Sequence, residues 1–219
     1  PQIDAELIAM GQMLLDSLGI RTSLEINSLG CPVCRPPYKE RLVSFLRQKH
    51  EDLCEDCRRR TTTNPLRVLD CKREGCKAVT ADVPPIYDYL CNDCASHFAK
   101  VKELLGELAI PFQINPRLVR GLDYYTKTAF EIVSTELGAQ NSVCGGGRYD
   151  GLVEELGGPP TPAVGMGIGL ERILLSLAGN APSLDQAIDV FLALEEERFR
   201  DEAFQSDGYF IVKDRINKT

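Results

Sequence analysis

Eight of the nine cysteines in this 219-residue chain fall in four close pairs between residues 31 and 94. The pairs are Cys31/Cys34, Cys54/Cys57, Cys71/Cys76 and Cys91/Cys94. Three pairs are C-x-x-C, a spacing that directs two thiolates at one ion, so one or two tetrahedral zinc sites are expected. A disulfide framework, which the lack of a secretory signal pattern disfavours, and small buried thiols are the alternatives. The spacing therefore predicts a separate cysteine-rich sub-domain.

Charge along the chain is uneven. The formal net charge is −7, yet residues 27–115 hold 14 Lys and Arg against 12 Asp and Glu. A basic segment in an acidic chain indicates either a local anionic partner or a solvated surface. The densest basic run is Arg58, Arg59 and Arg60, and guanidinium groups bind phosphate as a planar fork. The composition excludes disordered, collagen-like and coiled-coil classes, and no apolar run approaches the ~18 residues of a membrane span.

Hydrophobic periodicity predicts the regular elements. Helices are expected over residues 4–18, 38–48, 95–109, 149–156 and 169–177, and strands over 22–27, 112–115, 128–133, 142–144 and 163–167. Asp4 is predicted to cap the first helix and Gly19 to end it. Few regular β-α-β units occur, so the pattern predicts an α+β fold with an antiparallel sheet flanked by helices.

Three short segments carry the candidate chemistry. Residues 120–126 read RGLDYYT, in which arginine offers a fixed positive charge and each tyrosine an apolar face with a polar tip. Residues 144–151 read CGGGRYDG, where a strand ending in glycines presents backbone N–H groups to a ligand or makes a tight turn without one. Cys144 is expected to be packed or to line a pocket.

The third segment, residues 165–172, reads GMGIGLER. Alternating glycines in a strand leave space above the sheet for a flat ring, and Arg172 on the next helical turn can reach the phosphates or base of a nucleotide. The segment does not fit a dinucleotide-binding fingerprint, because the third glycine comes too early and no β-α-β unit follows.

Taken in order, RGLDYYT, GGGRYDGL and GMGIGLERI closely resemble the two histidine-specific motifs and class II motif 3 of bacterial-type histidyl-tRNA synthetases. The resemblance spans most of residues 1–194. It implies a class II catalytic domain, α+β with an antiparallel sheet flanked by helices, interrupted by a cysteine-rich and mainly helical insertion domain. The implied domains are a first catalytic part (1–26), the insertion (27–115), a second catalytic part (116–180), and a linker with a remnant of the anticodon-binding domain (181–219).

The resemblance also implies an activity. A cytoplasmic homodimer would activate L-histidine with ATP and Mg²⁺ to histidyl-adenylate, and transfer it to the 3′ end of histidine tRNA. Arg120 is implied as the catalytic residue. The implied histidine-binding residues are Arg120, Tyr124, Tyr125 and Tyr149, and the implied ATP-binding residues are Arg148, Gly167, Gly169 and Arg172. The insertion would contact the tRNA acceptor stem, with Arg58, Arg59 and Arg60 as candidates. Zinc is not a general family requirement, and its eight candidate ligands remain the paired cysteines.

Parts of the family pattern do not match. The chain is expected to be partial, lacking motifs 1 and 2 and most of the anticodon-binding domain. Residues 189–192 resemble the first strand of that domain, and a junction between separated segments is expected near Gln205 and Ser206. We therefore expect no complete adenylation from the chain as printed. Two alternatives stay open: the non-catalytic regulatory subunit of ATP phosphoribosyltransferase, which usually lacks the insert, and a folded but inactive tRNA- or metal-binding module.

Overall fold

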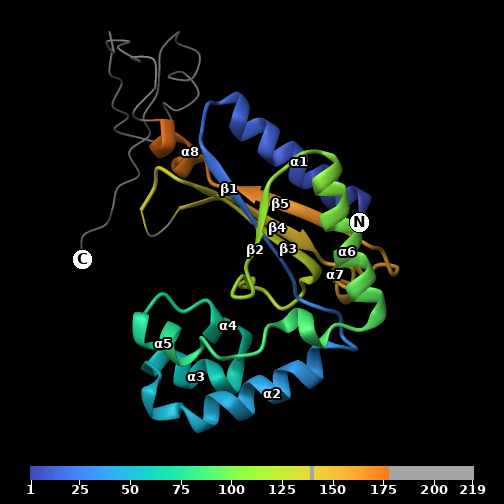
Figure 1. Ribbon diagram of the computed structural model, residues 1–219. Coiled ribbons are helices and arrows are strands. Elements are labelled where there is room, and N and C mark those ends of the chain that lie inside the picture. Colours follow the sequence, from blue (N-terminus) through green and yellow to red (C-terminus); the bar gives the residue numbers. More distant parts are fainter. Residues whose placement is uncertain (139–140, 178–219) are drawn as a thin grey trace, which may run out of the picture. The chain divides into compact units, whose positions relative to one another are not determined.

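The computed structural model describes residues 1–138 and 141–177 (Figure 1). These described residues belong to one compact unit. The expectations for residues 181–219, including the strand at 189–192 and the junction near Gln205, lie outside the described residues. No described helix has both the length and the apolarity needed to cross a membrane.

The centre of the fold is a five-stranded sheet in the order β2-β1-β3-β4-β5. The strands are β1 Thr22–Ser28, β2 Phe112–Ile114, β3 Thr126–Ser134, β4 Ser142–Arg148 and β5 Val164–Ile168. The pairs β1–β3, β3–β4 and β4–β5 are antiparallel, whereas β2 lies parallel to β1. The α+β class and the antiparallel sheet are confirmed, with β2 as the one parallel strand.

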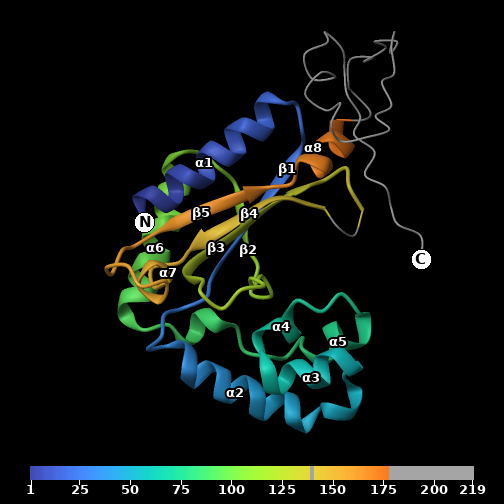
Figure 2. The same cartoon turned by 180° about the vertical axis from the view of Figure 1, so that it is seen from behind.

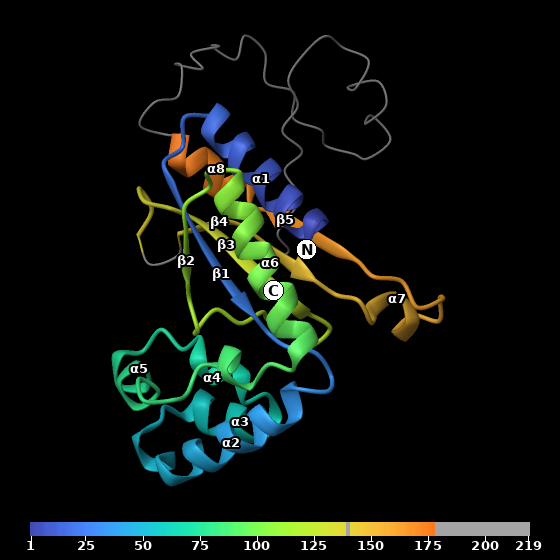
Figure 3. The same cartoon turned by 45° about the vertical axis from the view of Figure 1, so that its right-hand side comes forward.

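Helices α1 (Gln2–Ser17) and α6 (Asn92–Glu107) lie side by side against this sheet (Figure 3). Gly11 lets α1 approach the strands closely, since a β-carbon there would lie 3.2 Å from Ile132 Cδ1 and 3.1 Å from Met166 Sδ. Gly19, at φ +71°, follows the helix in a conformation that favours glycine. Both helices were predicted by apolar periodicity, and the structure confirms them within a few residues.

The predicted cap at Asp4 is wrong. Helix α1 begins at Gln2, which places Asp4 inside its first turn and fully buried. Its carboxylate accepts hydrogen bonds from Thr128 Oγ1 at 2.6 Å and Arg148 Nε at 3.2 Å, and His97 Nε2 lies 3.2 Å away. Burial raises the pKa of Asp4, but the adjacent His97 ring and the hydrogen bonds from Arg148 and Thr128 outweigh burial and hold the pKa well below its usual range. The sequence pattern that predicts this helix cannot show that Asp4 binds buried partners, because those partners lie on β3, β4 and α6, far away in the sequence.

The insertion is mainly helical, as expected. Its helices are α2 Arg35–Gln48, α3 Glu55–Thr63, α4 Leu66–Leu69 and α5 Glu74–Val79. Figures 1 and 2 show them grouped together beyond one end of β1. Tyr38, Leu42 and Leu46 of α2 form a buried cluster with Leu66 and Val68 of α4. Only α2 was predicted here, because the other three helices are too short to show a periodic apolar face.

The boundaries of this insertion stay predictions. Within residues 27–115, α6 packs against α1 and β2 pairs with β1, so both belong spatially with the sheet. Two 3-10 helices, His50–Asp52 and Ile86–Tyr89, also occur. Among the described residues the other α-helices are α7 Leu152–Glu155, shorter than the predicted 149–156, and α8 Leu170–Leu177, as predicted.

The buried Asp4 carboxylate leads to a first prediction. Asp4→Asn removes one of the two carboxylates that pair with the mostly buried Arg148 guanidinium and leaves only Asp150, so the free energy of unfolding is expected to fall by about 3 kcal/mol at neutral pH. Because the pKa of Asp4 is lowered on folding, its contribution is full above the unfolded pKa near ~4 and is lost as pH falls through the lower folded pKa. The difference between the two proteins should therefore shrink below about pH 4.

Urea unfolding between acidic and neutral pH measures this difference. Glu6→Gln, on an exposed carboxylate of the same helix, is the matched control and should change stability little. Equal stability of Asp4→Asn and the unaltered chain at neutral pH would contradict the proposed role of the carboxylate.

Candidate active site

The three glycines of GGGRYDGL lie inside strand β4 rather than at its end. The expectation that the strand stops at Cys144 and offers glycine N–H groups to a ligand is wrong. Gly145, Gly146 and Gly147 pair with β3 on one side and with β5 on the other. A strand flanked on both sides uses its backbone groups in the ladder, so the glycines serve a steric purpose instead.

That purpose is close approach by neighbouring groups. A β-carbon at Gly146 would lie 2.2 Å from the carbonyl oxygen of Gly165, which the sheet cannot accommodate without moving. A β-carbon at Gly145 would lie 2.8 Å from Arg120 Nη1. Gly145 thus lets the Arg120 side chain lie directly over the strand, and at Gly146, where the neighbouring atoms are backbone, only hydrogen fits.

One cavity brings the three sequence segments together. Its volume is about 460 Å³, and its lining residues are Arg120, Glu131, Ser142, Val143, Cys144, Gly145, Gly167, Gly169 and Arg172. All three segments therefore line the same cavity. The first contributes Arg120, the second Gly145, and the third Gly167, Gly169 and Arg172. At Gly167 a β-carbon would meet no atom within 4 Å, so β5 leaves open space here, as the glycine spacing predicts.

Arg120 is held in this cavity by Glu131 on β3. The Arg120 Nη1 and Glu131 Oε1 atoms are 2.8 Å apart, and both side chains are largely buried. Burial raises the pKa of Glu131, although the Arg120 charge opposes this shift. The Arg120 Nε atom is buried and has no hydrogen-bond partner among the described residues. The guanidinium is thus fixed in place with donor capacity left for an anion.

Sequence reasoning missed Glu131. The only available signal was an acidic residue inside an otherwise apolar strand, in the run AFEIV. Such a residue is often solvent-facing in an antiparallel sheet, so its pairing with Arg120 needed the register of β3.

The predicted histidine-binding tyrosines form one cluster. Ring centroids are 4.7 Å apart for Tyr124 and Tyr125, 5.8 Å for Tyr124 and Tyr149, and 6.1 Å for Tyr125 and Tyr149. The guanidinium carbon of Arg120 lies 5.5 Å from the Tyr125 centroid, which joins the cluster to the cavity. A β-carbon at Gly165 would lie 2.6 Å from the Tyr149 hydroxyl, so Tyr149 lies over the glycine strand β5.

The structure separates the two predicted ATP-binding arginines. Arg172 lines the cavity, and its Nη1 donates to the Ser142 carbonyl at 2.6 Å. Arg148 instead pairs with Asp4 and, at 2.8 Å, with Asp150, and its side chain is mostly buried. Its ATP-binding role stays a prediction, but its position makes it a link between α1 and β4.

Cys144 is packed, as predicted. Its thiol lies 3.6 Å from Met166 Sδ, and burial raises its pKa to about 11. A thiol with a raised pKa is a poor nucleophile at neutral pH, so the thiol acts as a small apolar group under the sheet.

The three consecutive arginines do not form one free basic surface. Arg58 donates to the carbonyls of Leu53 and Glu51, and Arg59 pairs with Asp56 at 3.0 Å. Consecutive helical residues also point about 100° apart, so the run spreads around α3.

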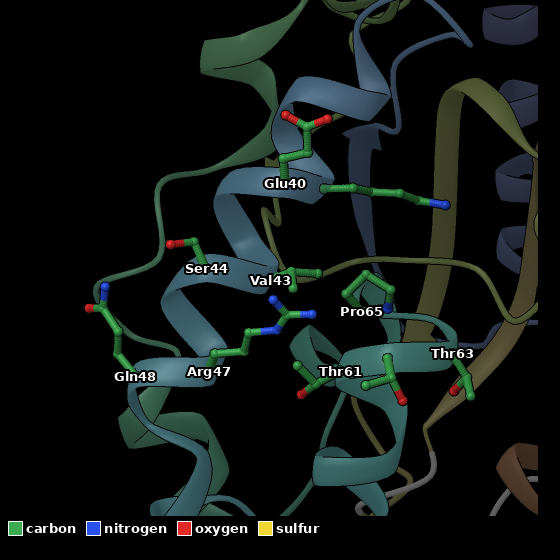
Figure 4. Close-up of a pocket in the computed structure, with 10 residues that line it drawn as sticks. Glu40, Val43, Ser44, Arg47, Gln48, Thr61, Thr63 and Pro65 are labelled. Atoms are coloured by element: carbon green, nitrogen blue, oxygen red, sulfur yellow. The ribbon is translucent and has the colours of Figure 1, made fainter.

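A larger groove of about 700 Å³ lies between α2 and α3. Its lining residues are Lys39, Glu40, Val43, Ser44, Arg47, Gln48, Thr61, Thr62, Thr63 and Pro65. Figure 4 shows Arg47 projecting from α2 toward the α3 threonines. Sequence reasoning missed this groove, because its two sides are brought together only by packing.

The sequence of this chain matches the family model described as histidyl-tRNA synthetase over residues 35–173. The chain belongs to the histidyl-tRNA synthetase family. The matched residues include the whole of the insertion helices and all three cavity segments, up to Ile173 in α8.

Individual relatives agree with this assignment. The chain is 56% identical to a histidine–tRNA ligase of Desulfotalea psychrophila over 81% of its own length and 42% of the relative. It is 47% identical to one of Trichlorobacter lovleyi over its full length and 54% of the relative. The chain spans about half the length of the curated relatives it matches.

Solved structures show the same fold. Apo histidyl-tRNA synthetase of S. aureus matches at a TM-score of 0.65 with 34% identity, over 93% of this chain and 52% of that one. A Bacillus halodurans protein described as an ATP phosphoribosyltransferase regulatory subunit/histidyl-tRNA synthetase matches at a TM-score of 0.51 with 19% identity, over 80% and 49%. At that identity the second likeness concerns the fold alone.

The glycine geometry leads to a second prediction, made with a matched pair of variants. Gly146→Ala places a methyl group against the Gly165 carbonyl and should lower the free energy of unfolding by about 3 kcal/mol. Gly167→Ala adds the same methyl group where no atom lies within 4 Å, so stability should change by less than about 0.5 kcal/mol. Urea unfolding followed by circular dichroism measures both, and similar losses in the two variants would contradict the steric argument.

Proposed function

We propose that this chain carries part of the active site of a histidine–tRNA ligase. The enzyme joins L-histidine to ATP as histidyl-adenylate, releases pyrophosphate, and transfers the histidyl group to the 3′ end of its tRNA. The observation that carries the proposal is the single cavity in which Arg120, Gly145, Gly167 and Arg172 meet. Relatives that match 81% and 100% of this chain are named histidine–tRNA ligases.

Arg120 acts at the reacting centre in this proposal. The histidine carboxylate attacks the α-phosphorus of ATP, and negative charge accumulates where the two anions meet. A fixed guanidinium stabilises that charge more strongly in the transition state than in the ground state. Glu131 is a positioning residue, because its 2.8 Å contact fixes the direction of Arg120 before substrates arrive.

The tyrosines Tyr124, Tyr125 and Tyr149 select the amino acid. Their clustered rings offer a flat apolar surface, and their hydroxyl groups can donate to or accept from an imidazole nitrogen. An amino acid without the imidazole would leave such a buried polar partner unpaired, which is the strongest form of discrimination available to a binding site.

ATP binds along β5 and the start of α8. Gly167 leaves room for a flat ring, Gly169 begins the turn into the helix, and Arg172 supplies charge for the phosphates. Arg148 supports ATP binding indirectly, because its pairing with Asp4 and Asp150 fixes the position of β4. Mg²⁺ enters with ATP as part of the substrate, and we assign no protein ligand to it, since the one carboxylate in the cavity lining is paired with Arg120.

The insertion contacts tRNA in this proposal. Arg58, Arg59 and Arg60 on α3 remain the candidates. The neighbouring groove adds Lys39 and Arg47, whose charged groups can bind phosphate oxygens. Arg58 has an indirect role in tRNA binding: its guanidinium already donates to two carbonyls, and it therefore holds α3 in position.

The protein that contains this chain is proposed to act as a cytoplasmic homodimer. The relatives are about twice as long, so motifs 1 and 2 and the anticodon-binding domain would complete the enzyme. The regulatory-subunit alternative is less supported, because the curated relatives at about 50% identity carry the ligase name. An inactive binding module would keep the fold without exchange activity, which the next experiment distinguishes.

The third prediction concerns the activation step. Arg120→Ala in the full-length protein should lower histidine-dependent ATP–pyrophosphate exchange by about 10²-fold or more, because it removes the charge that meets the α-phosphate. Arg21→Ala is the matched control, since that arginine is exposed and pairs only with Glu136 at the surface. Strong exchange that survives Arg120→Ala would remove Arg120 from the chemistry. Absence of exchange in a folded full-length protein would favour the regulatory subunit or the inactive module.

The fourth prediction concerns tRNA. Arg59→Ala with Arg60→Ala spares the carbonyl contacts of Arg58, and should reduce the slope of log affinity against log salt by about 2 for histidine tRNA. A double control, Arg21→Ala with Lys100→Ala, removes equal charge outside helices α2–α5. Filter binding at several salt concentrations measures both, and equal slopes in the two double variants would contradict the contact.

A further inference from the structure

The paired cysteines converge into two groups of four. Cys31, Cys34, Cys91 and Cys94 form one group, and Cys54, Cys57, Cys71 and Cys76 form the other. Within each group the sulfur atoms all lie within 4.8 Å of one another. The first cysteine pair in the sequence thus meets the fourth, and the second pair meets the third. Spacing alone left both the number of sites and this nested arrangement open.

The sulfur distances match a tetrahedron around one ion. Cys31 Sγ lies 3.7 Å from Cys34 Sγ and 3.8 Å from Cys91 Sγ. With Zn–S bonds of about 2.3 Å, the edge of a regular tetrahedron is about 3.8 Å, whereas a disulfide requires about 2.05 Å. All nine cysteines are free thiols. Four sulfurs this close can coordinate a single ion, and they leave no room for a cluster with bridging sulfides.

Backbone groups in both sites point at the sulfurs. The Cys31 N–H donates to Cys34 Sγ at 3.2 Å, and the Cys54 N–H donates to Cys76 Sγ at 3.3 Å. Backbone N–H groups that donate to the sulfur in this way orient a metal ligand from outside the coordination sphere. Gly30, at φ +65°, makes the first loop possible, because a β-carbon there would lie 2.7 Å from Cys34 Sγ.

We propose that the insertion holds two structural zinc ions, one in each tetrathiolate group. The first group is the neck site: Cys31 and Cys34 follow β1 where the chain leaves the sheet, and Cys91 and Cys94 open α6 where it returns. The second is the distal site, which joins α3 to α5. No other His, Cys, Asp or Glu group of comparable tightness occurs among the described residues.

The neck site is contiguous with the candidate active site. Arg35 directly follows Cys34, and its guanidinium donates to the carbonyls of Leu29 at 3.1 Å and Asp123 at 3.2 Å, and also to that of Tyr125. The same cation offsets the negative charge of four thiolates around a dication. Zinc at the neck thereby fixes the residue that holds the tyrosine loop.

The distal site compensates for a small core. Helices α3, α4 and α5 have nine, four and six residues, lengths at which isolated helices are not stable in water. Cys57 and Cys76 are almost completely buried among them. A metal supplies the cross-links that so few apolar side chains cannot provide.

Metal analysis of the full chain, purified under reducing conditions, tests the proposal. We expect two zinc ions per chain. Cys91→Ser with Cys94→Ser should leave one, Cys57→Ser with Cys76→Ser should leave one, and the control Cys144→Ser should retain two. Zinc at one ion per chain or below, iron in its place, or unchanged zinc in either double variant would overturn it.

Cobalt replacement in the unaltered chain covers the case in which a variant does not fold. Co²⁺ added to the zinc-depleted chain should give intense tetrahedral bands and thiolate-to-cobalt charge transfer that saturate at two ions per chain. Weak octahedral absorption, or saturation at one ion, would contradict the two sites. Neither measurement depends on enzymatic activity, so failure here would leave the proposed ligase function standing.

Discussion

The exclusion of side chains from the middle of β4 is the constraint on which the rest of the described structure depends. Gly146 lies so close to the β5 backbone that any β-carbon would overlap the Gly165 carbonyl. Gly145 on the same strand leaves the space that Arg120 occupies. β4 is paired on both sides, and its glycines leave space over the strand for neighbouring groups. The cavity is therefore an outcome of backbone geometry, with the reactive groups placed around it by neighbouring elements.

A buried ionic network fixes the opposite end of that strand. Asp4 from α1 meets Arg148 at the end of β4, Thr128 on β3 and His97 on α6. Such a network is not expected to add much stability over apolar packing, but breaking one partner is costly, so it specifies one arrangement of helices on the sheet. Arg148 thus joins the segment GGGRYDGL to the first helix and ties the position of the glycine strand to the fold as a whole.

The neck of the insertion connects the two halves of the proposed function. Arg35 links the cysteine loop to the carbonyls of the segment that carries Tyr124 and Tyr125. The helices proposed to meet tRNA and the residues proposed to meet histidine therefore share one set of hydrogen bonds. A rigid neck lets the insertion be an independent helical unit without loosening the loop beside Arg120.

Sequence alone determined the local elements and the identity of the family. Apolar periodicity located the long helices and most strands, and three ordered segments gave the resemblance that the family match confirms. It could not determine pairings between distant residues, because these depend on strand register and helix packing. Asp4 was taken for a cap, Glu131 was missed, and the glycines of β4 were placed at a strand end. Only the tertiary structure showed which cysteine pairs meet, since the chain brings Cys31 and Cys91 together across 60 residues.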